Sequence, residues 1–190
     1  MTTTPQQAAQ IGGGVWNVDQ NHSLIEFAAK HFDIAYVKGR FKGFTGTINV
    51  NDQDLLKSTV ELTIDARSLD SQAVQMREDL IKGEEMLEVD KYPTITFRST
   101  RIEQQGPTKF LVSGDLTLRG ITKQVHIPMQ FGGLVNTRMG PRAGFSGELT
   151  LNKSDFNVPF NREFEPGRQV VADDIKVELQ VEAAPAQPSQ

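Results

Sequence analysis

The sequence contains no cysteine, which excludes disulfide bonds, thiolate catalysis and cysteine-based zinc sites together. It also lacks an excess of basic residues, because 20 Lys and Arg stand against 24 Asp and Glu and give a net charge of −4. A nucleic-acid partner is therefore not expected, since a surface that binds phosphates needs clustered positive charge. No apolar run approaches the roughly 18 residues of a membrane-spanning helix. We therefore expect no stable membrane insertion.

Signatures of catalysis and of cofactor binding are missing as well. The sequence has no phosphate-binding loop and no dinucleotide fingerprint, and nothing in it resembles the nucleophile elbow of hydrolases. Ser23, His22 and Asp19 could be combined into a hydrolase triad on paper, but adjacent residues of a strand point to opposite faces. His126 has outward parity in its strand, so the histidines do not suggest a metal site. We expect no catalytic residue, no metal and no cofactor.

The chain has the length of one ordinary domain. Residues 1–13 are polar and glycine-rich and predict a disordered arm, residues 14–183 the folded domain, and residues 184–190 a flexible tail. The first residues have neither the basic nor the apolar region of a secretory signal. This predicts a cytoplasmic protein, or a periplasmic or secreted one if a signal has been removed.

The clearest pattern lies between Phe110 and Phe131. Apolar and polar residues alternate with a period of two up to Leu118, stop at Arg119-Gly120, and alternate again from Val125. Two strands of this kind around a glycine turn predict a long β-hairpin with one face out of water.

Similar alternation predicts further strands over residues 23–31, 37–50, 55–64, from 95 onward, 145–151 and 171–181. Within 37–50 the apolar parity changes near Gly43, which predicts a β-bulge that bends the strand. Residues 67–90 show no alternation and are rich in helix formers. They predict a helical insertion with Ser71 as a possible N-cap, divided by Gly83 into two short helices.

About eight strands with one apolar face each favour an antiparallel barrel or sandwich over a parallel sheet. Glycines recur at inward positions, where a close-packed sandwich would place side chains; they are Gly39, Gly43, Gly114 and Gly147. An eight-stranded barrel is about wide enough to hold one ligand. The pattern therefore predicts an all-β fold, an eight-stranded antiparallel barrel with a short helical insertion.

The inward positions are candidate ligand-binding residues, although alternation alone does not distinguish a filled interior from a lined one. They are Ile25, Phe27, Phe41, Phe44, Val60, Leu62, Phe97, Phe110, Val112, Gly114, Leu116, Leu118, Phe145, Leu149, Val177 and Leu179. Two further residues are candidates for a polar end of the site. His31 ends an apolar strand face, and Arg40, despite its outward parity, follows Gly39 near the expected mouth and could contact a phosphate or quinone oxygen.

Several motifs, in their order and spacing, resemble the YceI-like family. They are Trp16-x-x-Asp19-x-x-His22-Ser23, Gly39-Arg40-Phe41, Tyr92-Pro93-x-Ile95-x-Phe97-x-Ser99, Gly114-x-Leu116-Thr117-Leu118-x-Gly120 and Ser154-Asp155-Phe156. The resemblance implies a lipocalin-like barrel with an elongated apolar cavity. It also implies a long-chain isoprenoid lipid as ligand, either a polyprenyl phosphate or pyrophosphate or an isoprenoid quinone, and a homodimer. The sequence departs from the family pattern at Lys153, where arginine is usual, and at Asn157, where glycine is usual.

We therefore expect a protein that carries or sequesters such a lipid and is not an enzyme. One alternative is an enzyme that acts on an isoprenoid head group, which turnover of a polyprenyl substrate would reveal. The other is a dimeric stress-response interaction module whose lipid is only structural. Exchange of the ligand with membranes would argue against that alternative.

Overall fold

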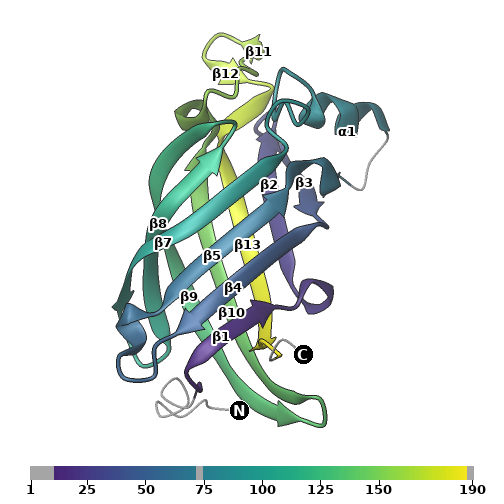
Figure 1. Cartoon of the computed structure of the whole chain (residues 1–190). Helices are drawn as coiled ribbons and strands as arrows, with labels where there is room; N and C mark the ends of the chain where they lie inside the picture. The colour runs from purple at the N-terminus through teal and green to yellow at the C-terminus, as the bar shows by residue number, and fades with distance from the viewer. Residues whose placement is uncertain (1–10, 72–74, 188–190) are drawn as a thin grey trace.

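The protein is a closed antiparallel β-barrel in the computed structural model, which describes residues 11–71 and 75–187 (Figure 1). Eight strands form the ring, and β1 closes it by pairing with both β4 and β13. In ring order they are β1 (Gly14–Val18), β4 (Phe44–Val50), β5 (Thr59–Asp65), β7 (Thr94–Gln104), β8 (Lys109–Leu118), β9 (Ile121–Thr137), β10 (Gly140–Asn152) and β13 (Val171–Pro185). This confirms the fold class predicted from the alternation.

Three further strands extend the sheet beyond β13. After β1 the chain makes a short 3₁₀ turn, Gln20–His22, and returns as β2 (Leu24–His31), which pairs with β13 between Val171 and Gln180. β3 (Ala35–Phe41) pairs with β2, and β6 (Leu69–Asp70) pairs with β3. The helix α1 (Gln75–Lys82) and the small hairpin of β11 (Glu163–Glu165) and β12 (Arg168–Gln169) lie at the upper end of the barrel in Figure 1. We call this end the helix end.

The predicted hairpin at 110–131 is confirmed. β8 and β9 pair in register from Lys109 opposite Gln130 to Leu118 opposite Ile121. Arg119 and Gly120 connect them with φ angles of 54° and 73°. Two successive residues with positive φ match the twist of the flanking strands, which is why such turns favour two-residue hairpins.

The single bulged strand predicted over residues 37–50 is wrong. β3 and β4 are separate strands that pair with different neighbours. Between them, the Gly43 amide donates to Ser68 Oγ at 2.8 Å and the Asp65 amide donates to the Gly43 carbonyl, also at 2.8 Å. The change of parity therefore marks a corner where the chain leaves one neighbour for another.

Two other boundaries also differ from the prediction. β5 begins at Thr59, because Leu55–Lys57 forms a 3₁₀ turn that the Asp54 side chain caps. After Gly83 the described chain forms turns and no second helix, since the amides of Leu87 and Val89 donate back to the carbonyls of Ile81 and Lys82. This return buries Val89 in the core cluster at the helix end. The N-cap assigned to Ser71 falls next to residues 72–74, which lie outside the described residues.

The inward glycines had suggested empty space for a ligand, but the structure shows that Gly39 and Gly114 leave none. A Cβ on Gly114 would collide with the Arg98 carbonyl oxygen and would lie 2.6 Å from Cζ of Phe97, and one on Gly39 would lie 2.5 Å from Cζ of Phe27. These glycines let aromatic rings of the neighbouring strands lie across the backbone. The space inside the barrel therefore does not come from these missing side chains.

The seam of the barrel is closed around Trp16, which is 3% exposed. Its cluster includes Val50 from β4, Phe131 from β9, Ala143 from β10 and Ala183 from β13. Ile11 packs against this cluster, and Trp16 lies opposite Pro185 in the β1–β13 pair. The disorder expected of the arm and the tail stays a prediction.

Candidate ligand-binding cavity

A cavity of about 610 Å³ occupies the barrel interior. This volume lies within the roughly 300–1,000 Å³ of typical small-molecule sites. Its walls are almost entirely apolar side chains, contributed by the barrel strands, by α1 and by the segment that follows β10. An apolar cavity of this kind can hold an apolar ligand without offering hydrogen bonds along its length.

Most of the residues predicted for the apolar site line this cavity. They are Ile25, Phe27, Phe41, Phe44, Val60, Leu62, Phe97, Phe110, Val112, Leu116, Leu118, Phe145, Leu149, Val177 and Leu179. Gly114 is not among the lining residues, because the Phe97 ring lies over it. The structure thus places these side chains at the cavity, and their role in binding a ligand stays a prediction.

The two residues predicted for a polar end are separated by the structure. His31 lines the cavity at the end of β2, with its ring packed edge-on against Phe32 at 4.2 Å between centroids. Arg40 does not line the cavity. Its Nε and Nη2 donate to Asp70 Oδ2 at 3.4 and 3.3 Å, and its side chain is 39% exposed. The outward parity of Arg40 indicated this placement correctly.

Sequence reasoning missed the lining that comes from outside the main strands. Phe156, Val158 and Phe160 line the cavity from a segment between the strands predicted over 145–151 and 171–181. Their spacing of two residues was a signal that they share one face, although Pro159 between the last two obscured it. Leu80 and Leu87 from the helical insertion also line the cavity, and Leu80 is 36% exposed. Leu80 is thus part of the cavity wall and of the protein surface at α1.

Lys153 is a buried cation at the helix end. It is 5% exposed, lines the cavity and begins the 3₁₀ turn Lys153–Phe156. Its Nζ donates to Gln169 Oε1 at 2.9 Å and forms an ion pair with Asp173. Because a buried charge is tolerated when it is paired, this ion pair lets Lys153 hold the start of the segment 153–170 against β13.

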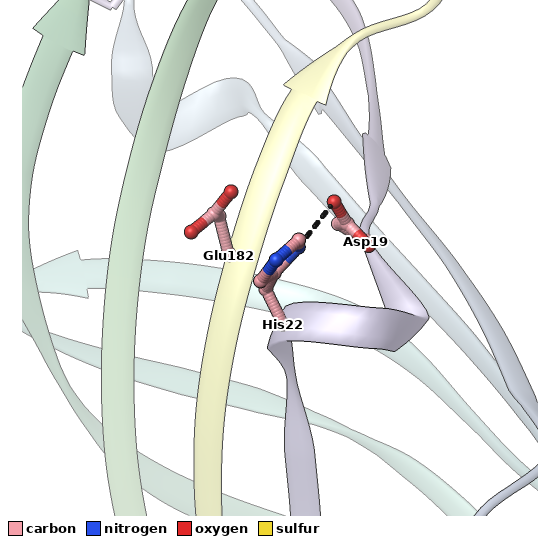
Figure 2. Close-up of side chains that lie close together, drawn as sticks. All are labelled: Asp19, His22 and Glu182. Carbon is pink, nitrogen blue, oxygen red and sulfur yellow. Dashed lines mark hydrogen bonds and ion pairs between the residues drawn. The ribbon is translucent and has the colours of Figure 1, made fainter.

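A second polar group, Asp19, His22 and Glu182, lies where the chain passes from β1 to β2 (Figure 2). His22 Nδ1 is 2.9 Å from Asp19 Oδ2, and one ligand-type atom from each residue lies within 4.8 Å of the others. Glu182 already forms an ion pair with Arg142 at 3.3 Å. The Asp19 amide donates to the Glu182 carbonyl, so this group holds the turn between β1 and β2 against β13.

The hydroxyl of Ser23 belongs to the same turn and does not contact a catalytic base there. Ser23 Oγ donates to the Glu182 carbonyl at 3.3 Å and accepts a bond from the Glu182 amide at 2.9 Å. The Asp-x-x-His-Ser motif is thus explained by the geometry of a strand crossover. It does not form the hydrolase triad that could be written from the sequence.

The Asp19–His22 contact predicts a pH dependence of stability. The hydrogen bond with Asp19 raises the pKa of His22 above 6.5, and the same bond lowers the pKa of Asp19 below 3.8. The contribution of protonated His22 to stability is fully present below pH 6.5 and is lost as the pH rises through the raised pKa of His22. The contribution of ionised Asp19 to stability is fully present above pH 3.8 and is lost as the pH falls through the lowered pKa of Asp19. The pair therefore stabilises the fold most between these two values.

We expect Asp19→Asn to destabilise the protein more at pH 5.5 than at pH 8.5, measured by urea unfolding at both values. NMR titration should show that the pKa of His22 falls in the variant. An equal loss of stability at the two pH values would mean that the cap of Asp19 on the Asn21 amide accounts for the whole effect.

The fold and the cavity define a lipocalin-like antiparallel β-barrel with an elongated apolar interior. In the described residues, no helix is long and apolar enough to cross a membrane. The chain belongs to the YceI-like family, whose model, a YceI-like domain, matches residues 16–183.

Relatives and solved structures agree with this assignment. A UPF0312 protein of Vibrio parahaemolyticus is 35% identical over 152 residues, which cover 80% of each chain. Among structures, BcnA of Burkholderia cenocepacia matches with a TM-score of 0.77 at 25% identity, over 88% of this chain and 99% of that one. A polyisoprenoid binding domain from Saccharophagus degradans matches with a TM-score of 0.68 over 90% and 98% of the two chains. Its 14% identity shows a shared fold.

Proposed function

We propose that the protein binds a long-chain isoprenoid lipid in the barrel cavity and carries or sequesters it away from water. The observation that supports this most directly is an apolar cavity that extends along the barrel and is lined by strand residues and by α1. Membership of the YceI-like family and the similarity in fold to a polyisoprenoid binding domain support the same ligand class.

The expected affinity follows from the area of lipid removed from water. Burial stabilises by about 0.8 kcal/mol per methylene, so each five-carbon isoprene unit contributes roughly 4 kcal/mol before costs. Drug-sized ligands retain about 0.3 kcal/mol per heavy atom, or about 1.5 kcal/mol per isoprene unit. Each unit that fits inside should thus tighten binding about tenfold.

A chain-length series tests this proposal. We expect the affinity of lipid-free protein to increase about tenfold per unit from geraniol to farnesol to geranylgeraniol, measured by isothermal titration calorimetry. The increase should stop at the length that fills the cavity, because further units would remain in water. Affinity that does not depend on chain length, or no binding, would overturn the proposal.

We further propose that the ligand is bound without chemical change. Along the described cavity wall, Ser58 is the one residue with a hydroxyl side chain. Its Oγ accepts a hydrogen bond from the Asn51 amide at 3.0 Å. A serine acts as a nucleophile only with a base in reach of its hydroxyl, whereas the Ser58 hydroxyl is bonded to a backbone amide. This arrangement supports binding over turnover.

A further inference from the structure

In the described residues, three buried polar atoms at the helix end have no hydrogen-bond partner, and two of them belong to residues that contact each other. These two are Nε of Arg77 on α1 and Oγ of Ser71, a residue that is 2% exposed. The two residues are in contact, because Arg77 Nη2 donates to the Ser71 carbonyl at 3.4 Å. Buried polar atoms are rarely left without partners, since each costs free energy unless something bonds to it. Of the two residues, Arg77 lines the cavity.

The charge of Arg77 is also unmatched. Within the part of the chain that the structure describes, no carboxylate lies within ion-pair distance of its guanidinium. Its neighbour Glu78 is paired with Lys82 at 2.7 Å. A guanidinium stays protonated at any pH a protein experiences. The cavity wall beside α1 therefore holds a permanent positive charge.

Lys153 and Arg119, two other cations at the helix end, already have carboxylate partners. Lys153 forms its ion pair with Asp173. Arg119 also has an unpartnered Nε, but its Nη2 donates to Glu88 Oε2 at 2.8 Å. Arg77 thus combines an unmatched charge, a buried unused donor and a place on the cavity wall.

We propose that Arg77 binds the anionic head group of the lipid, and that the protein selects a phosphorylated isoprenoid over a neutral alcohol or quinone. This inference rests on the proposed function and names the class of ligand that the cavity takes. A guanidinium offers two parallel donors to phosphate oxygens, which a neutral oxygen cannot use equally. The Ser71 carbonyl, which accepts the bond from Arg77 Nη2, holds the guanidinium in place beside the cavity. The isoprenoid chain would extend from there into the apolar cavity.

The test compares two ligands with the same twenty-carbon chain, geranylgeranyl monophosphate and geranylgeraniol, on lipid-free protein by isothermal titration calorimetry. We expect wild type to bind the phosphate about tenfold to a hundredfold more tightly, the effect of hydrogen bonds to a charged group. Arg77→Gln should remove this preference and leave geranylgeraniol binding unchanged. Arg77→Lys, which keeps the charge but loses the paired donors, should retain part of it.

Arg67→Gln is the matched control. Arg67 is exposed at the same end, lies outside the cavity wall, and has its closest acidic partner, Asp90, 4.0 Å away. Its replacement removes the same charge and should keep the preference for phosphate.

The outcomes separate this inference from the proposed function. If wild type binds both ligands equally, the choice of head group is wrong and the lipid cavity stands. If neither ligand binds, the proposed function itself fails. If Arg77→Gln weakens both ligands to the same extent, or if Arg67→Gln also removes the preference, Arg77 is not the head-group ligand.

Discussion

Replacing Leu179 by glutamate is expected to abolish lipid binding while the barrel stays folded. Leu179 lines the cavity from β13, and it lies opposite Ile25 on one side and Gly147 on the other. A carboxylate facing an empty cavity of this size can be hydrated. A bound lipid would displace that water and leave the charge buried without a partner, at a cost of about 3–5 kcal/mol. The affinity for geranylgeraniol should fall at least a hundredfold.

Gln180→Glu is the control for this prediction. Gln180 is the next residue of β13, and its exposed side chain donates to Glu178 on the outer face. The substitution adds the same negative charge but does not place it in the cavity. Binding should remain at the wild-type level in calorimetry, with circular dichroism to verify folding of both variants. Equal binding by Leu179→Glu and wild type would mean that the lipid does not occupy the barrel interior.

Replacing Trp16 by alanine is expected to cause a large loss of stability. Trp16 is buried where β1 closes the ring, and its indole Nε1 donates to the Gly12 carbonyl at 2.9 Å. Truncation of a buried Trp typically costs about 3–5 kcal/mol, because the removed ring leaves a cavity. Urea unfolding followed by far-UV circular dichroism would measure the loss, since the variant has no tryptophan fluorescence.

Val15 offers a comparison on the same strand. Its side chain is 46% exposed, so Val15→Ala should change the free energy of unfolding by no more than about 0.5 kcal/mol. If Trp16→Ala destabilised no more than Val15→Ala, β1 would not be a stabilising part of the ring. The barrel would then be held together by the remaining strand pairs.

Alternation in the sequence predicted the barrel strands well where one strand keeps the same neighbours along its length. The hairpin of β8 and β9 is such a case, because its register follows directly from the Arg119-Gly120 turn. Alternation was misleading where the chain changes neighbours. β3 and β4 follow one another with only Lys42-Gly43 between them, and parity alone does not distinguish a bulge from a corner.

The apolar lining of the cavity was predictable, whereas the charged lining from Arg77 and Lys153 was not. A strand pattern reports which face avoids water, so it identified residues such as Phe97 and Leu149. Arg77 and Lys153 reach the cavity from a helix and a 3₁₀ turn, and no strand pattern includes such residues. The glycine pattern was misread because a missing side chain was taken as empty space, whereas Phe97 and Phe27 fill the space over Gly114 and Gly39. The homodimer and the cytoplasmic location stay predictions.

The most direct test of a lipid-binding barrel is to identify what the purified protein already contains. Native mass spectrometry of the wild-type protein, followed by organic extraction and mass analysis of the released molecule, would measure this. We predict one lipid per chain with an isoprenoid mass, a phosphorylated head group, and no such lipid in Leu179→Glu. Protein that is reproducibly empty and that takes up no isoprenoid when it is offered one would contradict the account.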